Sequence, residues 1–257
     1  MNSIMFKRGQ VSVFVIVGII IVILAALFFF LRSEVGLFVN PTTFLNEKSR
    51  PIEDNLKVCV RNVTLTNLNL LAKQGGNLNP TNYVLYQSNP VSFFCNNIPN
   101  DRKCLNVMPT FDNLVTNLNA EIQSGVNDCV DKGLVENGFG YEVNAGSIKT
   151  ELTILGDSVA VKADYDIKIK KGEITQEIRP IVERFDIPIQ DLYGVSVDVI
   201  NSEASLGYFE QLLYMLNERG QFIVNLDKPY PNKIYRVQKK GSDFEFWFAV
   251  EGERGDG

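Results

Sequence analysis

The sequence predicts an α+β protein in which an N-terminal apolar helix precedes a disulfide-linked domain of helices packed on an antiparallel β-meander. Three observations indicate this class. Residues 11–31 form one apolar run, and the segments around Cys59 and Cys129 repeat apolar residues at helical spacing. From about residue 148 the apolar period becomes two, which is typical of strands with one buried face. Helices grouped apart from antiparallel strands indicate an α+β fold.

The run 11–31 has the length of a membrane-spanning helix. Ser12 is its only polar residue and it holds no charge, and a spanning helix needs about 20 apolar residues. A cleaved secretory signal has a shorter apolar region and a small-residue cleavage site, which residues 32–34 do not provide. We therefore expect the segment to be kept in the working protein, with the lipid bilayer as a partner.

The charges beside the run predict its orientation. Lys7 and Arg8 precede it directly, so the positive-inside rule makes residues 1–9 a cytoplasmic leader. The membrane helix then covers 10–36, and residues 37–257 form an extracellular α+β domain. We expect a single-pass membrane protein, or an extracellular filament if the leader is removed.

Residues 7–12, KRGQVS, carry a resemblance to a known family. A basic pair, a glycine and a Gln-x-Ser start directly before an apolar helix resemble the class III signal of archaeal type IV pilin-like proteins. The resemblance implies that a prepilin peptidase is a partner and cuts between Gly9 and Gln10. Phe14 stands where many of those pilins carry glutamate, a departure that bears on filament assembly more than on cleavage. The later chain, with cysteine-bearing helices before a meander, resembles anchored archaeal surface proteins, which implies no particular activity.

Four cysteines lie in the exported part, and none shows Cys-x-x-Cys spacing. The chain has no histidine to complete a zinc site. An even number in an exported chain indicates two disulfides, and three connectivities are possible. Cys59 and Cys129 lie on the apolar faces of two predicted helices, and Cys95 and Cys104 share one polar loop. We expect Cys59–Cys129 and Cys95–Cys104; the alternative is four buried thiols.

The first half of the exported part reads as two helices joined by a loop. A helix is predicted over 50–73, ended by Gln74-Gly75-Gly76. Residues 77–109 hold four prolines and many asparagines, which predicts a long loop. A second helix follows Pro109, capped by Thr110, and ends near residue 136.

The second half reads as strands, a long helix and more strands. A hairpin is predicted from the alternation in 148–154 and 159–169, with a third strand over 174–182. Pro188 opens one helix of about 30 residues, and two or three strands complete the chain. Two sub-lobes, 44–186 and 187–257, are a possible division. The expected buried stripe of the long helix is Leu192, Val195, Val199, Leu206, Phe209, Leu213 and Leu216.

Composition and motifs argue against catalysis and nucleic acid binding. The formal net charge of -5 lacks the basic face that phosphates require. The absence of histidine removes the commonest general base near neutral pH. Asp164 and Asp166 share a strand face with Lys162 and Lys168, a pattern typical of a solvated face with cross-strand ion pairs. We expect no enzyme activity, no cofactor and no metal site.

Two further features bear on surface contacts. Asn62 starts an Asn-Val-Thr glycosylation sequence, although on a predicted helix. Aromatic residues are concentrated late in the chain, and Trp247, Phe246 and Tyr208 are the candidates for protein contacts if their rings are exposed; the alternative for the strand is burial.

The sequence therefore favours a non-catalytic surface protein, either a pilin-like subunit or a membrane-anchored component. Self-association or other surface proteins would be its partners, in assembly or attachment. The competing hypothesis is an anchored extracytoplasmic enzyme or ligand-binding domain with a site between the helices and the meander.

Overall fold

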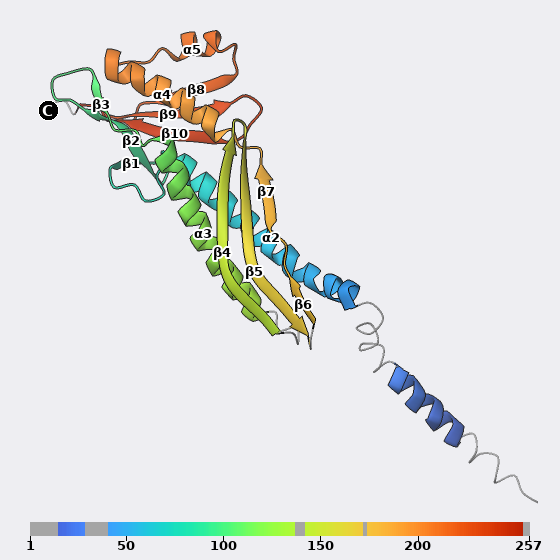
Figure 1. The fold of residues 1–257 in the computed structure, drawn as a ribbon. Coiled ribbons are helices and arrows are strands. Elements are labelled where there is room, and N and C mark those ends of the chain that lie inside the picture. Colours follow the sequence, from blue (N-terminus) through green and yellow to red (C-terminus); the bar gives the residue numbers. More distant parts are fainter. Residues whose placement is uncertain (1–14, 29–40, 137–141, 172–173, 254–257) are drawn as a thin grey trace, which may run out of the picture.

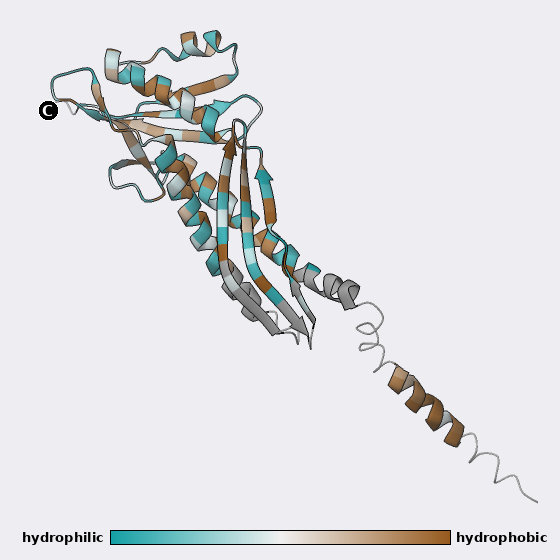
Figure 2. Ribbon diagram, in the orientation of Figure 1, coloured by the Kyte–Doolittle hydropathy of each residue, from teal (hydrophilic) through white to brown (hydrophobic). Residues whose placement is uncertain are grey.

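The computed structural model describes residues 15–28, 41–136, 142–171 and 174–253. Residues 15–28 are helical, exposed and apolar along their length (Figure 2). Within these described ranges, no helix combines the length and apolar composition needed to cross a membrane. The predicted leader and its peptidase site, Lys7, Arg8, Gly9 and Gln10, lie outside the described residues.

The described chain beyond residue 40 has two regions, a stalk and a head (Figure 1). The stalk consists of the helices α2 (Pro41–Lys73) and α3 (Phe111–Glu136) packed against each other and against a four-stranded sheet. The head consists of a six-stranded sheet with the helices α4 (Ile189–Leu206) and α5 (Gln211–Asn217). The α+β class is therefore confirmed.

The stalk sheet is the predicted antiparallel meander. Its strands are β4 (Glu142–Leu155), β5 (Ser158–Lys171), β6 (Ile174–Glu177) and β7 (Ile181–Phe185). The central strand β5 pairs with β4 on one side and with both β6 and β7 on the other. The predicted third strand is thus two short strands. Pro180 lies between them, and it has no N–H to donate to a ladder.

The stalk helices differ from prediction mainly at the start. α2 begins at Pro41, nine residues before the predicted start at Arg50, and proline is well suited to the first helical position. It ends at Lys73 as expected, because Gly75 and Gly76 both have φ of +71° and left-handed residues end helices. The cap of α3 is also confirmed, since Thr110 Oγ1 accepts the Asn113 N–H at 3.3 Å.

The prediction of a structureless loop over 77–109 is wrong. This segment forms three strands, β1 (Tyr83–Tyr86), β2 (Asn89–Asn97) and β3 (Cys104–Asn106). They join β8 (Phe222–Asp227), β9 (Lys233–Lys239) and β10 (Glu245–Val250) in the head sheet. Pairing with distant strands overrides the turn preference of the asparagines, because β propensity depends strongly on tertiary context.

The head sheet has the order β1-β2-β10-β9-β8, with β3 beside β2. All pairings are antiparallel except β10 with β2, which is parallel. The head sheet therefore takes strands from both sides of the suggested division near residue 186. β2, from the first half of the chain, lies between β1 and the late strand β10, and one continuous core connects the two regions.

Both expected disulfides are present. Cys59–Cys129 joins α2 to α3, and Cys95–Cys104 joins β2 to β3. Sequence separations of 70 and 9 residues correspond to stabilisations of about 4 and about 3 kcal/mol on the chain-entropy model. The larger contribution holds the two stalk helices together.

The predicted single helix from Pro188 to Arg219 is wrong in its middle. α4 ends at Leu206 because Gly207 has φ of +79°, and α5 begins at Gln211 after four intervening residues. The chain also passes closely here, since a Cβ atom on Gly207 would lie 2.6 Å from the main-chain oxygen of Arg102. The break changes which residues of the expected stripe face the core.

Replacing Gly207 by alanine is expected to lower the free energy of unfolding by about 2 kcal/mol. The alanine would be held in a left-handed conformation while its Cβ meets the Arg102 backbone. Chemical denaturation of the variant measures the loss. Gly194 on α4 is the control, because a Cβ there meets nothing within 4 Å; its alanine variant should be as stable as the parent or slightly more so. Equal stability of the two variants would contradict the account.

Candidate functional site

Two of the three aromatic contact candidates are buried. Phe246 is fully buried and Trp247 is 5% exposed. The predicted alternation along β10 is correct, but β10 is an inner strand and both of its faces are covered. Trp247 packs with Val91 and Ile234 on one face, and Phe246 joins the main core on the other. Neither ring is available to a partner.

Tyr208, the third candidate, is 52% exposed and lies at the start of an unusual surface. On α5, Leu212, Leu213 and Leu216 are 72%, 59% and 76% exposed. We call these three the leucine face. α5 contains no buried residue, although a surface helix normally turns apolar residues inward and polar residues outward. Single exposed apolar side chains are common on protein surfaces, but a cluster of large ones is typical of an interaction site.

Contacts on its inner side fix the orientation of α5. The Tyr214 hydroxyl donates to Asp198 Oδ2 of α4 at 2.9 Å, and the Val224 N–H of β8 donates to Met215 Sδ at 3.4 Å. The Phe209 ring contacts the rings of Tyr214 and Tyr235. The tyrosine and the methionine therefore face the protein, and the three leucines are turned to the outside. α5 itself lies at the top of the head (Figure 1).

A buried ionic cluster anchors the chain just before α5. Glu203, near the end of α4, is 1% exposed. Its oxygens accept from Lys233 Nζ at 2.6 and 2.9 Å, and it also accepts from the Tyr235 hydroxyl. Lys233 also donates to the Gly207 carbonyl at 3.2 Å. Burial, with the hydrogen bond to Glu203, raises the pKa of Tyr235. The cluster joins α4 to β9 and so holds the base of the α4–α5 connection.

No protein-family model, no curated protein and no solved structure matches this chain.

The region between the helices and the meander, proposed as a cleft in the competing hypothesis, is part of the core. α3 contributes Leu118, Ile122 and Val126, and the sheet contributes Val161 and Ile167; all five are fully buried. This packing gives no support to a ligand site there.

The carboxylates of β5 form a solvated face as expected, but two of its three ion pairs lie within the strand and only Lys168–Glu177 crosses to β6. Lys162 pairs with Asp164 at 3.6 Å, and Lys168 pairs with Asp166 at 3.5 Å and with Glu177 at 3.6 Å. Asp166 is the main cause of a raised pKa of Lys168. Among the described residues, no group of three or more histidine, cysteine, aspartate or glutamate side chains could hold a metal ion.

The glycosylation sequence lies inside α2. Asn62 is exposed, but Thr64 is fully buried. In the folded helix the threonine of the recognition sequence is not accessible to an enzyme, so modification of Asn62 would have to precede folding. The leucine face on the head is therefore a better candidate for a functional surface than the region around Asn62.

A polar cluster on the outer face of the head sheet predicts a pH effect. Tyr86 of β1 donates to Asp227 of β8 at 2.6 Å, and Arg236 Nε donates to the same oxygen at 3.0 Å. The tyrosine hydrogen bond and the guanidinium hold the pKa of Asp227 below its usual 3.8. A lowered folded-state pKa stabilises the fold above about pH 3.8, and this contribution is lost as the pH falls through the folded value.

The variant Asp227→Asn is therefore expected to melt below the parent at neutral pH, with a difference that shrinks below pH 3.8. Melting temperatures of both proteins between pH 2.5 and 7 measure it. A difference that stays constant over this range would show that Asp227 contributes through packing and not through its charge.

Proposed function

We propose that this chain is a non-catalytic cell-surface protein that works in assembly or attachment through protein–protein contacts. The leucine face is the contact surface, and its partner is a second copy of the chain. The observation that carries this proposal is the outward orientation of three leucines on a helix that buries none of its residues. The fixed inner contacts of α5 support it, because the leucines reach the surface without any rearrangement.

The leucine face is too small to hold two copies together alone. Specific stable interfaces bury at least about 1,200 Å² in total, which three leucines on each side do not supply. The apolar segment 11–31 offers a second contact, in a bilayer or in a filament core. Confinement there raises the effective concentration of the heads, so a weak head contact becomes sufficient.

The proposal has an anchored and a filament version. In the anchored version, the N-terminal segment stays in the bilayer and the domain is extracellular. In the filament version, prepilin peptidase cuts between Gly9 and Gln10 and the apolar helices pack together. The resemblance of residues 7–12 to a class III signal supports cleavage, whereas Phe14 in place of glutamate argues for the anchor.

Mass spectrometry of the native N-terminus, combined with electron microscopy of the cell surface, separates the versions. A chain that starts at Gln10 within filaments supports the filament version. A chain that starts at Met1 in the membrane fraction supports the anchor and excludes the filament. Recovery of the whole chain from the soluble cytoplasmic fraction would contradict the proposal in both versions.

A further inference from the structure

A hollow of about 530 Å³ lies at one end of the head sheet, where the parallel strands β2 and β10 both finish. Four segments that are distant in sequence form it: the start of β1, the end of β2, the β8–β9 connection and the residues after β10. Its main polar and aromatic lining residues are Asn82, Tyr83, Asn97, Asn232, Glu251 and Glu253.

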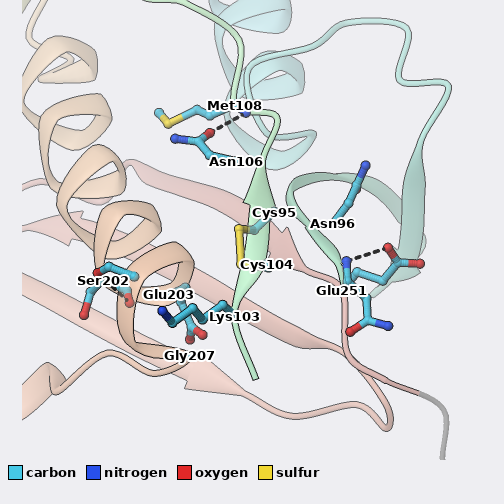
Figure 3. Close-up of a disulfide and its surroundings, with 12 residues drawn as sticks. Cys95, Asn96, Lys103, Cys104, Asn106, Met108, Ser202, Glu203, Gly207 and Glu251 are labelled. Carbon is cyan, nitrogen blue, oxygen red and sulfur yellow. Dashed lines mark hydrogen bonds between the residues drawn. A yellow bond between two sulfur atoms is a disulfide. The ribbon is translucent and has the colours of Figure 1, made fainter. Parts of the chain in front are cut away.

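A second hollow of about 490 Å³ adjoins the first and shares the residues after β10 with it. It extends past the Cys95–Cys104 disulfide to Glu203 and Gly207 at the end of α4. Figure 3 shows this disulfide between the end of α4 on one side and Glu251 on the other. The disulfide and the Glu203–Lys233 ion pair both lie beside the second hollow, so they stabilise the structure next to the residues after β10 that the two hollows share.

Hydrogen bonds within the protein fix the polar groups of the first hollow. Asn82 Nδ2 donates to Asn96 at 2.9 Å, and the Gly252 N–H donates to Asn232 Oδ1 at 3.1 Å. The Asn97 N–H donates to Glu251 Oε2 at 3.0 Å. A site whose groups are already oriented loses less conformational entropy when it binds a ligand.

Each of these side chains keeps a second polar atom for a ligand. Among the hydrogen bonds between described residues, Asn82 Oδ1 and Glu251 Oε1 remain as acceptors and Asn232 Nδ2 remains as a donor. Tyr83 adds an aromatic side chain, and the residue is 45% exposed. The hollow therefore combines two hydrogen-bond acceptors, one amide NH₂ group with two N–H donors, and an aromatic side chain.

This combination selects the chemical class of the ligand. Glu251 and Glu253 disfavour anions, and none of the described residues that line this hollow is lysine or arginine. The amide and carboxylate lining disfavours a purely apolar ligand, because those groups would lose water without a hydrogen-bonding partner. Hydroxyl groups suit the lining well, since each can donate to a carboxylate and accept from an amide.

We propose that this hollow binds a neutral carbohydrate, with one sugar ring stacked on Tyr83 and its hydroxyls bonded to Asn82, Asn232 and Glu251. The size agrees, because small-molecule sites usually occupy about 300–1,000 Å³. This site is separate from the leucine face, and it does not depend on self-association. It gives the head a means of attachment to glycans.

The test is calorimetric titration of the full-length chain, held in zwitterionic micelles because sugar-based detergents would compete. The probes are maltoheptaose, cellohexaose, mannohexaose and chitohexaose. At least one is expected to bind the parent. Tyr83→Ala is expected to weaken that binding about tenfold, through loss of stacking and of buried apolar area. Tyr208→Ala, which removes a ring of similar exposure elsewhere on the head, is the matched control and should bind like the parent.

A second variant tests the polar part of the site. Glu251→Gln keeps an oxygen for the Asn97 N–H, so its fold should be retained. It replaces the carboxylate that accepts sugar hydroxyls, and binding should weaken about tenfold. The proposal is overturned if no probe binds the parent, if Tyr83→Ala and Tyr208→Ala bind equally, or if polyphosphate or an extended peptide along β1 binds in place of the sugars.

Discussion

The double variant Leu212→Gln/Leu216→Gln is expected to weaken self-association of the full-length chain at least 100-fold while leaving its fold intact. Both side chains are more than 70% exposed, so they contribute little to the core. Burying each of them in an interface is worth about 1.5 kcal/mol or more, and two such losses correspond to about a 100-fold change in the association constant. Glutamine preserves α5, because it is a good helix former.

Sedimentation velocity in zwitterionic micelles measures the association, and circular dichroism with thermal melting measures the fold. The matched control is Val58→Gln, which removes an exposed apolar residue from α2 of the stalk. The control should associate like the parent. If the double variant also associates like the parent, the leucine face is not the contact surface.

The variant Lys233→Met is expected to destabilise the fold by about 3–5 kcal/mol. It removes the ammonium group that neutralises Glu203 and leaves a nearly fully buried carboxylate without its cation. In a chain of this size, that loss corresponds to a fall in melting temperature of roughly 10 °C. Equilibrium denaturation at pH 7 gives the free energy directly.

The double variant Glu203→Gln/Lys233→Met is the matched control for this prediction. It removes the buried charge together with its partner, and its glutamine can still accept from Tyr235. Much of the lost stability should return, because an uncompensated buried charge costs more than an absent ion pair. A single variant as stable as the parent would show that Glu203 does not carry a buried charge in the folded protein.

Local periodicity was enough to predict the two paired helices and the main hairpin of the stalk. The helical spacing around Cys59 and Cys129 indicated which cysteines face each other, and alternation from residue 148 indicated the β4–β5 hairpin. These features arise from neighbours in sequence, so a short window contains the physical information that specifies them.

The head was predicted less well because its strands pair over long sequence distances. β2 pairs with β10 across about 150 residues, and no local pattern in an asparagine-rich segment indicates that partner. The same pairing makes β10 an inner strand, and this explains why Trp247 is buried although alternation placed it opposite the core. Whether both faces of a strand are covered depends on the neighbouring strands of the sheet, which the local sequence around Trp247 does not reveal.

The leucine face was missed because the helix break was missed. Leu206, Leu213 and Leu216 were expected in one buried stripe that assumed a continuous helix from Pro188 onward. Gly207, the left-handed residue that ends α4, was the available signal. Once α5 is a separate helix, Leu213 and Leu216 of the expected stripe are more than half exposed and, with Leu212, form the candidate contact surface; Leu206, the last residue of α4, is also exposed.

Disulfide trapping on intact membranes or filaments tests the central claim, that leucine faces of two copies meet, most directly. All four native cysteines are paired, so Leu213→Cys provides one new thiol at a position 59% exposed. The control is Val182→Cys in β7 of the stalk, 60% exposed. Under mild oxidation, Leu213→Cys is expected to give a covalent dimer and Val182→Cys to remain monomeric. Equal dimer yields from the two positions, or no dimer from Leu213→Cys, would contradict the account.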